Sequence, residues 1–305
     1  MPDKSTVRVA VTQHEPEWLD LQKSVEKTCK IIEEAAVGGA ELVTFAEAFI
    51  PGYPAWIWTR PLDPVLSTQY IQNSLAVDSD EMRKIQDCAA RNKIVVSLGF
   101  SENDNNSVYI AQALIDSDGA MLMNRRKLKA THMERTIFGD ASGDSLLNVS
   151  KTSIGRKVGT LACWEHAQPL LKFNTISQKE EIHCAAWPPI VPHQGGPDLW
   201  SLSKEGESQV IGYCVPMAAD RIYRLPESIP GLRNRIRLTF NLRYFCLASL
   251  APSIRRTSIP SARDAASNLL EYLDKVGLMH IGKGRQNPLH VDYVFLGACL
   301  GFIQD

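Results

Sequence analysis

In residues 159–170, GTLACWEHAQPL, an apolar run is followed directly by a cysteine, a tryptophan and two ionisable residues. The apolar run 158–162 has the length of a short buried strand, and Cys163 follows it where the chain turns. A helix over 169–181 and another strand over 182–187 are expected next, which makes this stretch part of an α/β fold. A thiol at a strand end is held rigidly and can face a pocket, as a nucleophile must. The alternative is a small core side chain, the commoner use of a cysteine in an apolar run.

A second motif lies at residues 39–54, GAELVTFAEAFIPGYP. The strand-like segment 42–46 places Glu47 in an apolar and aromatic neighbourhood. Glutamates are rarely buried without a partner, and burial raises the pKa of a carboxyl group toward neutrality. We therefore expect Glu47 to transfer protons as a general base. The alternative is an exposed glutamate at the end of a strand.

A third motif is the basic run 124–139, NRRKLKATHMERTIFG. Such runs usually form solvated surfaces or contact anions. Here Glu134 follows closely and could orient a lysine ammonium while keeping it charged. Both Lys127 and Lys129 are candidates for that ammonium.

The order of Glu, Lys and Cys at the ends of successive strand-like segments resembles the nitrilase superfamily of carbon–nitrogen hydrolases. Residues 182–189, IHCAAWPP, and 126–135 look like the nitrilase branch, in particular its fungal and bacterial aromatic or arylacetonitrile type. The resemblance covers residues 7–209. It implies Cys163 as nucleophile, Glu47 as base, Lys127 as the catalytic lysine because it directly follows an arginine, and Glu134 as a supporting carboxylate.

The resemblance also implies the family's α-β-β-α sandwich, an α/β fold, and homo-oligomers that are dimers or spiral filaments. It implies no cofactor and no metal. The expected reaction converts a nitrile to a carboxylic acid and ammonia through a thioimidate and a thioester on Cys163. The Lys127 ammonium and the Trp164 backbone N–H would stabilise the tetrahedral intermediate. An early departure of the thiol would give an amide instead.

Aromatic residues near these motifs suit aryl or arylalkyl nitriles, because flat rings stack well on one another. The candidate substrate-binding residues are Tyr53, Trp164 and Trp187. The alternative for each of them is an ordinary core position.

Composition supports an enzyme with one large core. The chain has 305 residues, 44% of them hydrophobic, and a net charge of −1, which gives no electrostatic reason to bind nucleic acid. Seven cysteines without regular spacing favour a reducing compartment, and no paired Cys-x-x-Cys or histidine cluster suggests zinc. No signal peptide or long apolar run is visible, so we expect no membrane association and a cytoplasmic location.

Periodicity in the first two thirds alternates strands and helices. The pattern predicts a helix over 19–38 with Val25, Ile31, Ile32 and Ala35 facing inward, and a helix over 80–92. Strands are predicted over 7–13, 42–46 and 94–100, and a hairpin over 107–116 and 121–127.

After residue 209 the pattern changes, so we divide the chain into a hydrolase domain at 1–209 and an atypical region at 210–305. Arginine now outnumbers lysine, none of the family's closing strands is evident, and 235–260 has no clear strand or helix signature. A helix at 261–276 and an apolar segment at 291–302 are the only elements suggested. The region is a diverged tail, a fused element, or the product of altered splicing or reading frame, and partial disorder is compatible with its composition.

Two classes of function follow from this division. The first is a thiol-dependent nitrilase with a small-molecule nitrile substrate. The second is a catalytically impaired nitrilase-like subunit of an assembly. An amidase or a cyanide hydratase with the same triad is a related enzymatic alternative.

Overall fold

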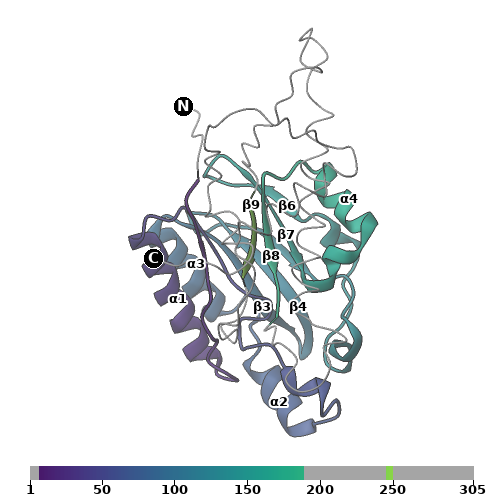
Figure 1. Cartoon of the computed structure of the whole chain (residues 1–305). Coiled ribbons are helices and arrows are strands. Elements are labelled where there is room, and N and C mark those ends of the chain that lie inside the picture. Colours follow the sequence, from purple (N-terminus) through teal and green to yellow (C-terminus); the bar gives the residue numbers. More distant parts are fainter. Residues whose placement is uncertain (1–6, 189–244, 250–305) are drawn as a thin grey trace, which may run out of the picture.

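Two β-sheets form the centre of the molecule (Figure 1). The computed structural model describes residues 7–188 and, as backbone, a strand at 245–249. The first sheet contains, in order, β1 (Val9–Val11), β2 (Leu42–Thr44), β3 (Val95–Asp104), β4 (Ser107–Ile115) and β5 (Met121–Arg126). The second contains β6 (Val149–Lys151), β7 (Lys157–Ala162), β8 (Ile182–Ala186) and β9 (Phe245–Ser249). Strands β1 to β3 are parallel to one another, as are β7 to β9, whereas β4, β5 and β6 join by antiparallel pairing.

Helices cover the outer side of each sheet (Figure 1). Helices α1 (Leu21–Val37) and α3 (Asp80–Asn92) cover the first sheet, and α4 (Pro169–Ser177) lies on the side of the second. Helix α2 (Pro64–Asn73) lies at one end of the molecule. Four short 3₁₀ turns complete the described elements: η1 (Ala55–Trp58), η2 (His132–Thr136), η3 (Gly143–Leu146) and η4 (Cys163–Ala167).

Adjacent residues of the central strands face different cores. Leu42 and Val95, which are paired in register, pack with Leu114 and with Val158 of the second sheet, so they fill the space between the sheets. Their neighbours Val43 and Val96 pack against α1 and α3 on the outer side. Because side chains alternate across a strand, one sheet can bury both of its faces in this way. The layers are therefore helix, sheet, sheet and helix, which confirms the predicted α-β-β-α sandwich.

Helix starts follow local capping chemistry. The Asp20 carboxylate accepts the N–H of Lys23 at 3.0 Å, and the Ser79 hydroxyl accepts that of Met82 at 3.2 Å. The helix predicted over 19–38 is thus confirmed, with Val25, Ile31 and Ile32 buried and Ala35 partly buried. Helix α2 was not predicted, although Asp63 followed by Pro64 is a recognisable start signal.

The hairpin of β4 and β5 is confirmed at the predicted place, around residues 117–119. Strand β3 runs past the predicted end at residue 100 and reaches Asp104. There Asn105 and Asn106 both have positive φ angles, of 52° and 69°, and connect β3 to β4 by a two-residue turn. Asparagine tolerates this left-handed conformation, so a second hairpin was readable at this position.

The range 235–260 has no clear strand signature in the sequence, yet β9 lies within it and pairs in parallel with all five residues of β8. A parallel strand is a continuous apolar run without alternation, so the period-two pattern does not mark it. The 209/210 boundary, the helix at 261–276, the segment at 291–302 and the proposed origins of the C-terminal region lie outside the described residues. Within the described part of the chain, every helix is too short or too polar to cross a lipid bilayer.

Candidate active site

Cys163 lies where β7 ends and η4 begins. Its φ angle is +48°, a left-handed conformation that non-glycine residues rarely adopt. The side chain is buried, and the end of β8 lies beside it because Ala162 pairs with Ala186. Strained backbone of this kind persists where the surrounding structure fixes it, and it is frequent at functional sites.

Glu47 follows β2 of the opposite sheet. Its backbone N–H donates to the carbonyl of Trp187 at 3.1 Å, which ties the end of β2 to the end of β8. Gly99 of β3 allows the chain to pass closely: a Cβ there would lie 2.0 Å from the Ala46 carbonyl oxygen. Glu47 is 1% exposed, as the sequence predicted for a buried carboxylate.

Lys127 comes directly after β5 and connects two carboxylates. Its Nζ donates to Glu47 Oε1 at 3.0 Å and to Glu134 Oε2 at 2.8 Å. Glu134, in η2, also accepts the N–H of Thr131 at 2.7 Å and the hydroxyl of Tyr53 at 3.0 Å. The structure thus brings together all four residues predicted for the chemistry. A sulfur or oxygen atom of each acidic group, Glu47, Glu134 and Cys163, lies within 4.8 Å of the others.

Burial controls the protonation of this cluster. It raises the pKa of Glu47 to about 8, against the opposing attraction of Lys127. Burial alone would lower the pKa of Lys127, but Glu47, Cys163 and Glu134 outweigh it and raise that pKa well above its ordinary value. Burial also raises the pKa of the Cys163 thiol, while Lys127 opposes the rise. The resting thiol is therefore protonated and needs a base.

The same acidic groups could in principle hold a metal ion, since they offer two carboxylates and a thiol in one place. The Lys127 ammonium, however, already contacts both carboxylates at hydrogen-bond distance. A cation would have to displace this ammonium, so the donor set suits an internal positive charge better than a metal.

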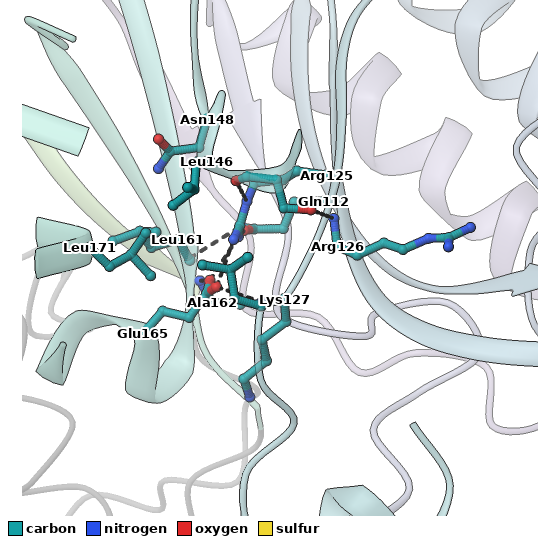
Figure 2. A network of polar contacts seen from close by, with 12 residues as sticks. Gln112, Arg125, Arg126, Lys127, Leu146, Asn148, Leu161, Ala162, Glu165 and Leu171 are labelled. Carbon is teal, nitrogen blue, oxygen red and sulfur yellow. Dashed lines mark hydrogen bonds and ion pairs between the residues drawn. The ribbon is translucent and has the colours of Figure 1, made fainter. Parts of the chain in front are cut away.

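A second buried ion pair connects the two halves of the site (Figure 2). Arg125 of β5 holds Glu165 of η4 through two hydrogen bonds of 2.7 and 2.6 Å. Glu165 also accepts the N–H groups of Ala162 at 2.9 Å and Leu128 at 3.0 Å, on either side of the cluster. Burial opposes ionisation of Glu165, yet Arg125 lowers its pKa overall. Through Glu165 the strand that carries Lys127 is therefore joined to the turn that carries Cys163.

Comparison with known proteins identifies the family. The carbon-nitrogen hydrolase profile matches residues 8–220. The chain belongs to the carbon-nitrogen hydrolase family. Two arylacetonitrilases of Aspergillus niger are 63% and 60% identical to it over 206 residues, in each case over 68% of this chain. The matched parts are 62% and 61% of those proteins, so this carbon-nitrogen hydrolase matches less than two thirds of their length.

A solved structure supports the fold independently. The carbon-nitrogen hydrolase of Helicobacter pylori G27 superposes with a TM-score of 0.53 over 68% of each chain, at 15% sequence identity. At that identity the likeness concerns the fold alone.

Within this carbon-nitrogen hydrolase, the other predicted site residues lie in different settings. Lys129 is exposed and pairs with Asp140, away from the cluster. Tyr53 is buried and donates to Glu134, so it is part of the polar cluster. The Trp164 ring contacts His132 edge-on, at 5.4 Å between centroids. Trp187 is buried and stacks on His166. Substrate contact by these aromatic rings stays a prediction.

Some residues that shape the site were missed. Arg125 and Glu165 lie inside the quoted motifs. Because a basic run usually forms a solvated surface, the sequence did not indicate that they form a buried ion pair. Trp58 is not among the predicted site residues, yet its indole N–H donates to the Tyr53 hydroxyl at 3.2 Å. Gly99 carried no sequence signal beyond being a glycine inside a strand, which often marks close backbone approach.

Proposed function

We propose that this protein hydrolyses nitriles to carboxylic acids and ammonia. One observation carries the proposal: a buried thiol, a buried ammonium and a buried carboxylate meet at the ends of strands from two sheets. Glu47 Oε1 is bound to Lys127, whereas its buried Oε2 has no hydrogen-bond partner among the described residues. An unpaired buried carboxylate oxygen is suited to take a proton from a thiol or from water.

In the first stage, Cys163 attacks the nitrile carbon. Glu47 accepts the thiol proton and passes it to the nitrile nitrogen, so that a thioimidate forms on sulfur. The Lys127 ammonium keeps Glu47 close by and supplies fixed positive charge near the developing negative charge. Glu134 holds that ammonium in place from its other side.

In the second stage, water completes the hydrolysis. Glu47 removes a proton from one water molecule, whose oxygen adds to the thioimidate carbon. Both protons of that water reach the nitrogen, one by way of Glu47 and the other from the hydroxyl group of the tetrahedral intermediate. The nitrogen leaves as ammonia, and a thioester remains. A second water then hydrolyses the thioester, which releases the acid and returns the proton to Cys163. Two waters are consumed for each nitrile.

Arylacetonitriles are the proposed substrate class. The two Aspergillus niger relatives, 63% and 60% identical to this chain over 206 residues, carry the name arylacetonitrilase. Tyr53 and Trp164 lie beside the polar cluster and provide aromatic surface there.

Turnover of phenylacetonitrile by the full-length protein tests this proposal. We expect ammonia and phenylacetic acid in equal amounts, and neither from Cys163→Ala. Because Cys163→Ala removes only one sulfur atom from a buried turn, circular dichroism should show a folded variant. Product formation that persists in Cys163→Ala would remove the proposed nucleophile.

A second substrate, phenylacetamide, separates the alternatives when it is tested beside phenylacetonitrile. Phenylacetamide turnover without nitrile turnover would assign the protein to amide hydrolysis with the same cluster. A folded protein that turns over neither substrate would fit a nitrilase-like subunit without activity of its own.

We also propose that the protein forms homo-oligomers. On the outer side of α4, Leu170 and Phe173 are 84% and 72% exposed, and Leu147 beside them is 75% exposed. Asn174 of α4 donates to the Leu146 carbonyl at 2.8 Å, which places the two segments side by side. A group of large apolar side chains on one surface is typical of a contact between protein chains.

A further inference from the structure

Three buried hydrogen bonds lead from a carboxylate to the backbone of Cys163. Glu180 Oε2 lies 2.7 Å from His183 Nδ1, and His183 Nε2 lies 3.0 Å from His166 Nε2. His166 Nδ1 in turn lies 2.6 Å from the Cys163 carbonyl oxygen. Glu180 is 3% exposed and both histidines are fully buried. The nitrile mechanism above uses none of these three side chains.

The bond to the Cys163 carbonyl determines which atom is donor and which is acceptor in all three hydrogen bonds. A carbonyl oxygen can only accept, so His166 must carry its proton on Nδ1. Burial, together with His183, lowers the pKa of His166 well below its ordinary value, so the ring is neutral and its Nε2 accepts. His183 must then donate from Nε2, and one further proton is shared between its Nδ1 and Glu180. Without a donor at His183, the His166 ring could take the other tautomer and lose its bond to Cys163.

The carbonyl that His166 holds belongs to the peptide group between Cys163 and Trp164. A trans peptide is planar, and its C=O and N–H point in opposite directions. Fixing the oxygen therefore fixes the direction of the Trp164 N–H. That N–H lies beside the Cys163 thiol and lowers the pKa of the thiol, against the larger rise that burial causes. It is also the backbone donor expected to stabilise the tetrahedral intermediate.

Neighbouring residues leave space for Glu180 and restrain the His166 ring. Gly159 of β7 leaves room for Glu180, because a Cβ at that position would lie 1.9 Å from Glu180 Oε2. Trp187 stacks on the His166 ring, with centroids 5.3 Å apart and an interplanar angle of 20°. The ring is therefore restrained both by stacking and by hydrogen bonds at its two nitrogens.

We propose that Glu180, His183 and His166 are positioning residues that orient the Cys163–Trp164 peptide, so that the Trp164 N–H points at the reacting sulfur and the adjoining carbon. The catalytic part of this inference rests on the proposed nitrile hydrolysis. The positioning of the thiol does not, because it concerns the reactivity of Cys163 itself.

Paired variants distinguish the hydrogen bonds made by the two ring nitrogens of His166. Asn places its amide nitrogen where His166 Nδ1 lies and can still donate to the Cys163 carbonyl, whereas Gln reaches toward His183 without that donation. We expect His166→Gln to lower kcat for phenylacetonitrile by roughly tenfold to a hundredfold at nearly constant KM, and His166→Asn to lower it clearly less. Gln at His183 can still donate to His166, so His183→Gln should retain more activity than His183→Leu.

A second readout makes the test independent of turnover. The rate at which iodoacetamide alkylates Cys163, followed by mass spectrometry of the peptide that contains it, should fall in the same order, with circular dichroism and Tm as folding controls. Equal rates for His166→Asn and His166→Gln, or for His183→Gln and His183→Leu, would overturn the proposal. If the parent protein turns over no nitrile, the proposed function fails, while the alkylation order still decides the positioning role.

Discussion

At the scale of single residues, the cluster combines two carboxylates with one ammonium. The raised pKa of Glu47, about 8, means that at neutral pH most molecules keep a proton on this carboxyl group. Lys127 and Glu134 then balance each other as an ion pair. Burial of an unbalanced charge is costly, so the protonated form of Glu47 is the expected resting state.

The rate should therefore depend on pH through Glu47. Because a base must be deprotonated, kcat/KM should rise between about pH 6 and about pH 9.5, with a midpoint near the Glu47 pKa of about 8. Initial rates of ammonia release from phenylacetonitrile measure this profile, and Lys129→Gln, outside the cluster, should show the same midpoint. A rate that is flat over this range would contradict the assignment of Glu47 as base.

The same pKa bears on stability. Folding raises the Glu47 pKa from 4.5 to about 8, so the folded protein keeps this proton where the unfolded chain has lost it. The contribution of Glu47 to stability is therefore complete below about pH 4.5 and is lost as the pH rises through about 8.

Lys127 is buried and Lys129 is exposed, so their substitution should have different effects on activity and stability. Lys127→Gln leaves the buried Glu134 carboxylate without its cation, so we expect no detectable turnover and a loss of roughly 3–5 kcal/mol in the free energy of unfolding. Lys129→Gln removes only an exposed pair with Asp140, so unfolding should change by less than about 0.5 kcal/mol. Urea denaturation of both variants measures the difference. Similar losses for the two would argue against a structural and catalytic role specific to Lys127.

At the scale of secondary-structure elements, Gly99 sets how closely the Glu47 loop approaches β3. The Phe49 N–H donates to the Gly99 carbonyl at 3.0 Å, on the same strand segment that the Ala46 carbonyl approaches. Any Cβ at residue 99 would force these backbones apart.

We therefore expect Gly99→Ala to displace Glu47. Overpacking of this kind costs roughly 1–3 kcal/mol in stability, and displacement of the base by about 1 Å should lower kcat/KM on the order of a hundredfold. Gly143→Ala is the matched control, because a Cβ there meets nothing within 4 Å. Thermal unfolding and phenylacetonitrile kinetics of the two variants test this, and an unimpaired Gly99→Ala would show that the loop can shift without loss.

Helices and strands could be predicted from the sequence where the residues of a single element contain the whole pattern. The periodicity of α1 and α3 and the apolar run of β7 were readable because each pattern depends only on its own residues. Strand β9 was missed because its five residues do not stand out by themselves and its pairing with β8 identifies it, and Gly99 because its neighbour lies in another part of the chain. The pairing of Arg125 with Glu165 likewise depends on how the two sheets face each other.

At the scale of the whole molecule, the apolar group of Leu170, Phe173 and Leu147 should govern assembly. If α4 forms the contact between copies, Phe173→Glu should reduce the molar mass measured by light scattering after size-exclusion chromatography. Val37→Glu is the control: Val37 is also exposed, at 89%, but ends α1 on the opposite side of the molecule. Retention of the parent mass in Phe173→Glu, or its loss in Val37→Glu, would place the contact elsewhere.

The nucleophile belongs to one sheet and its base to the other. The layer between them is largely apolar, and only a few directional bonds cross it, among them the Glu47 N–H to the Trp187 carbonyl and Arg125 to Glu165. A slip of one sheet past the other would part Cys163 from Glu47 while every helix and strand stayed intact. A displacement of about 1 Å between the reacting groups is enough to stop catalysis. Local movements of that size occur before a protein unfolds as a whole. On heating, activity should therefore be lost at a lower temperature than the Tm of unfolding.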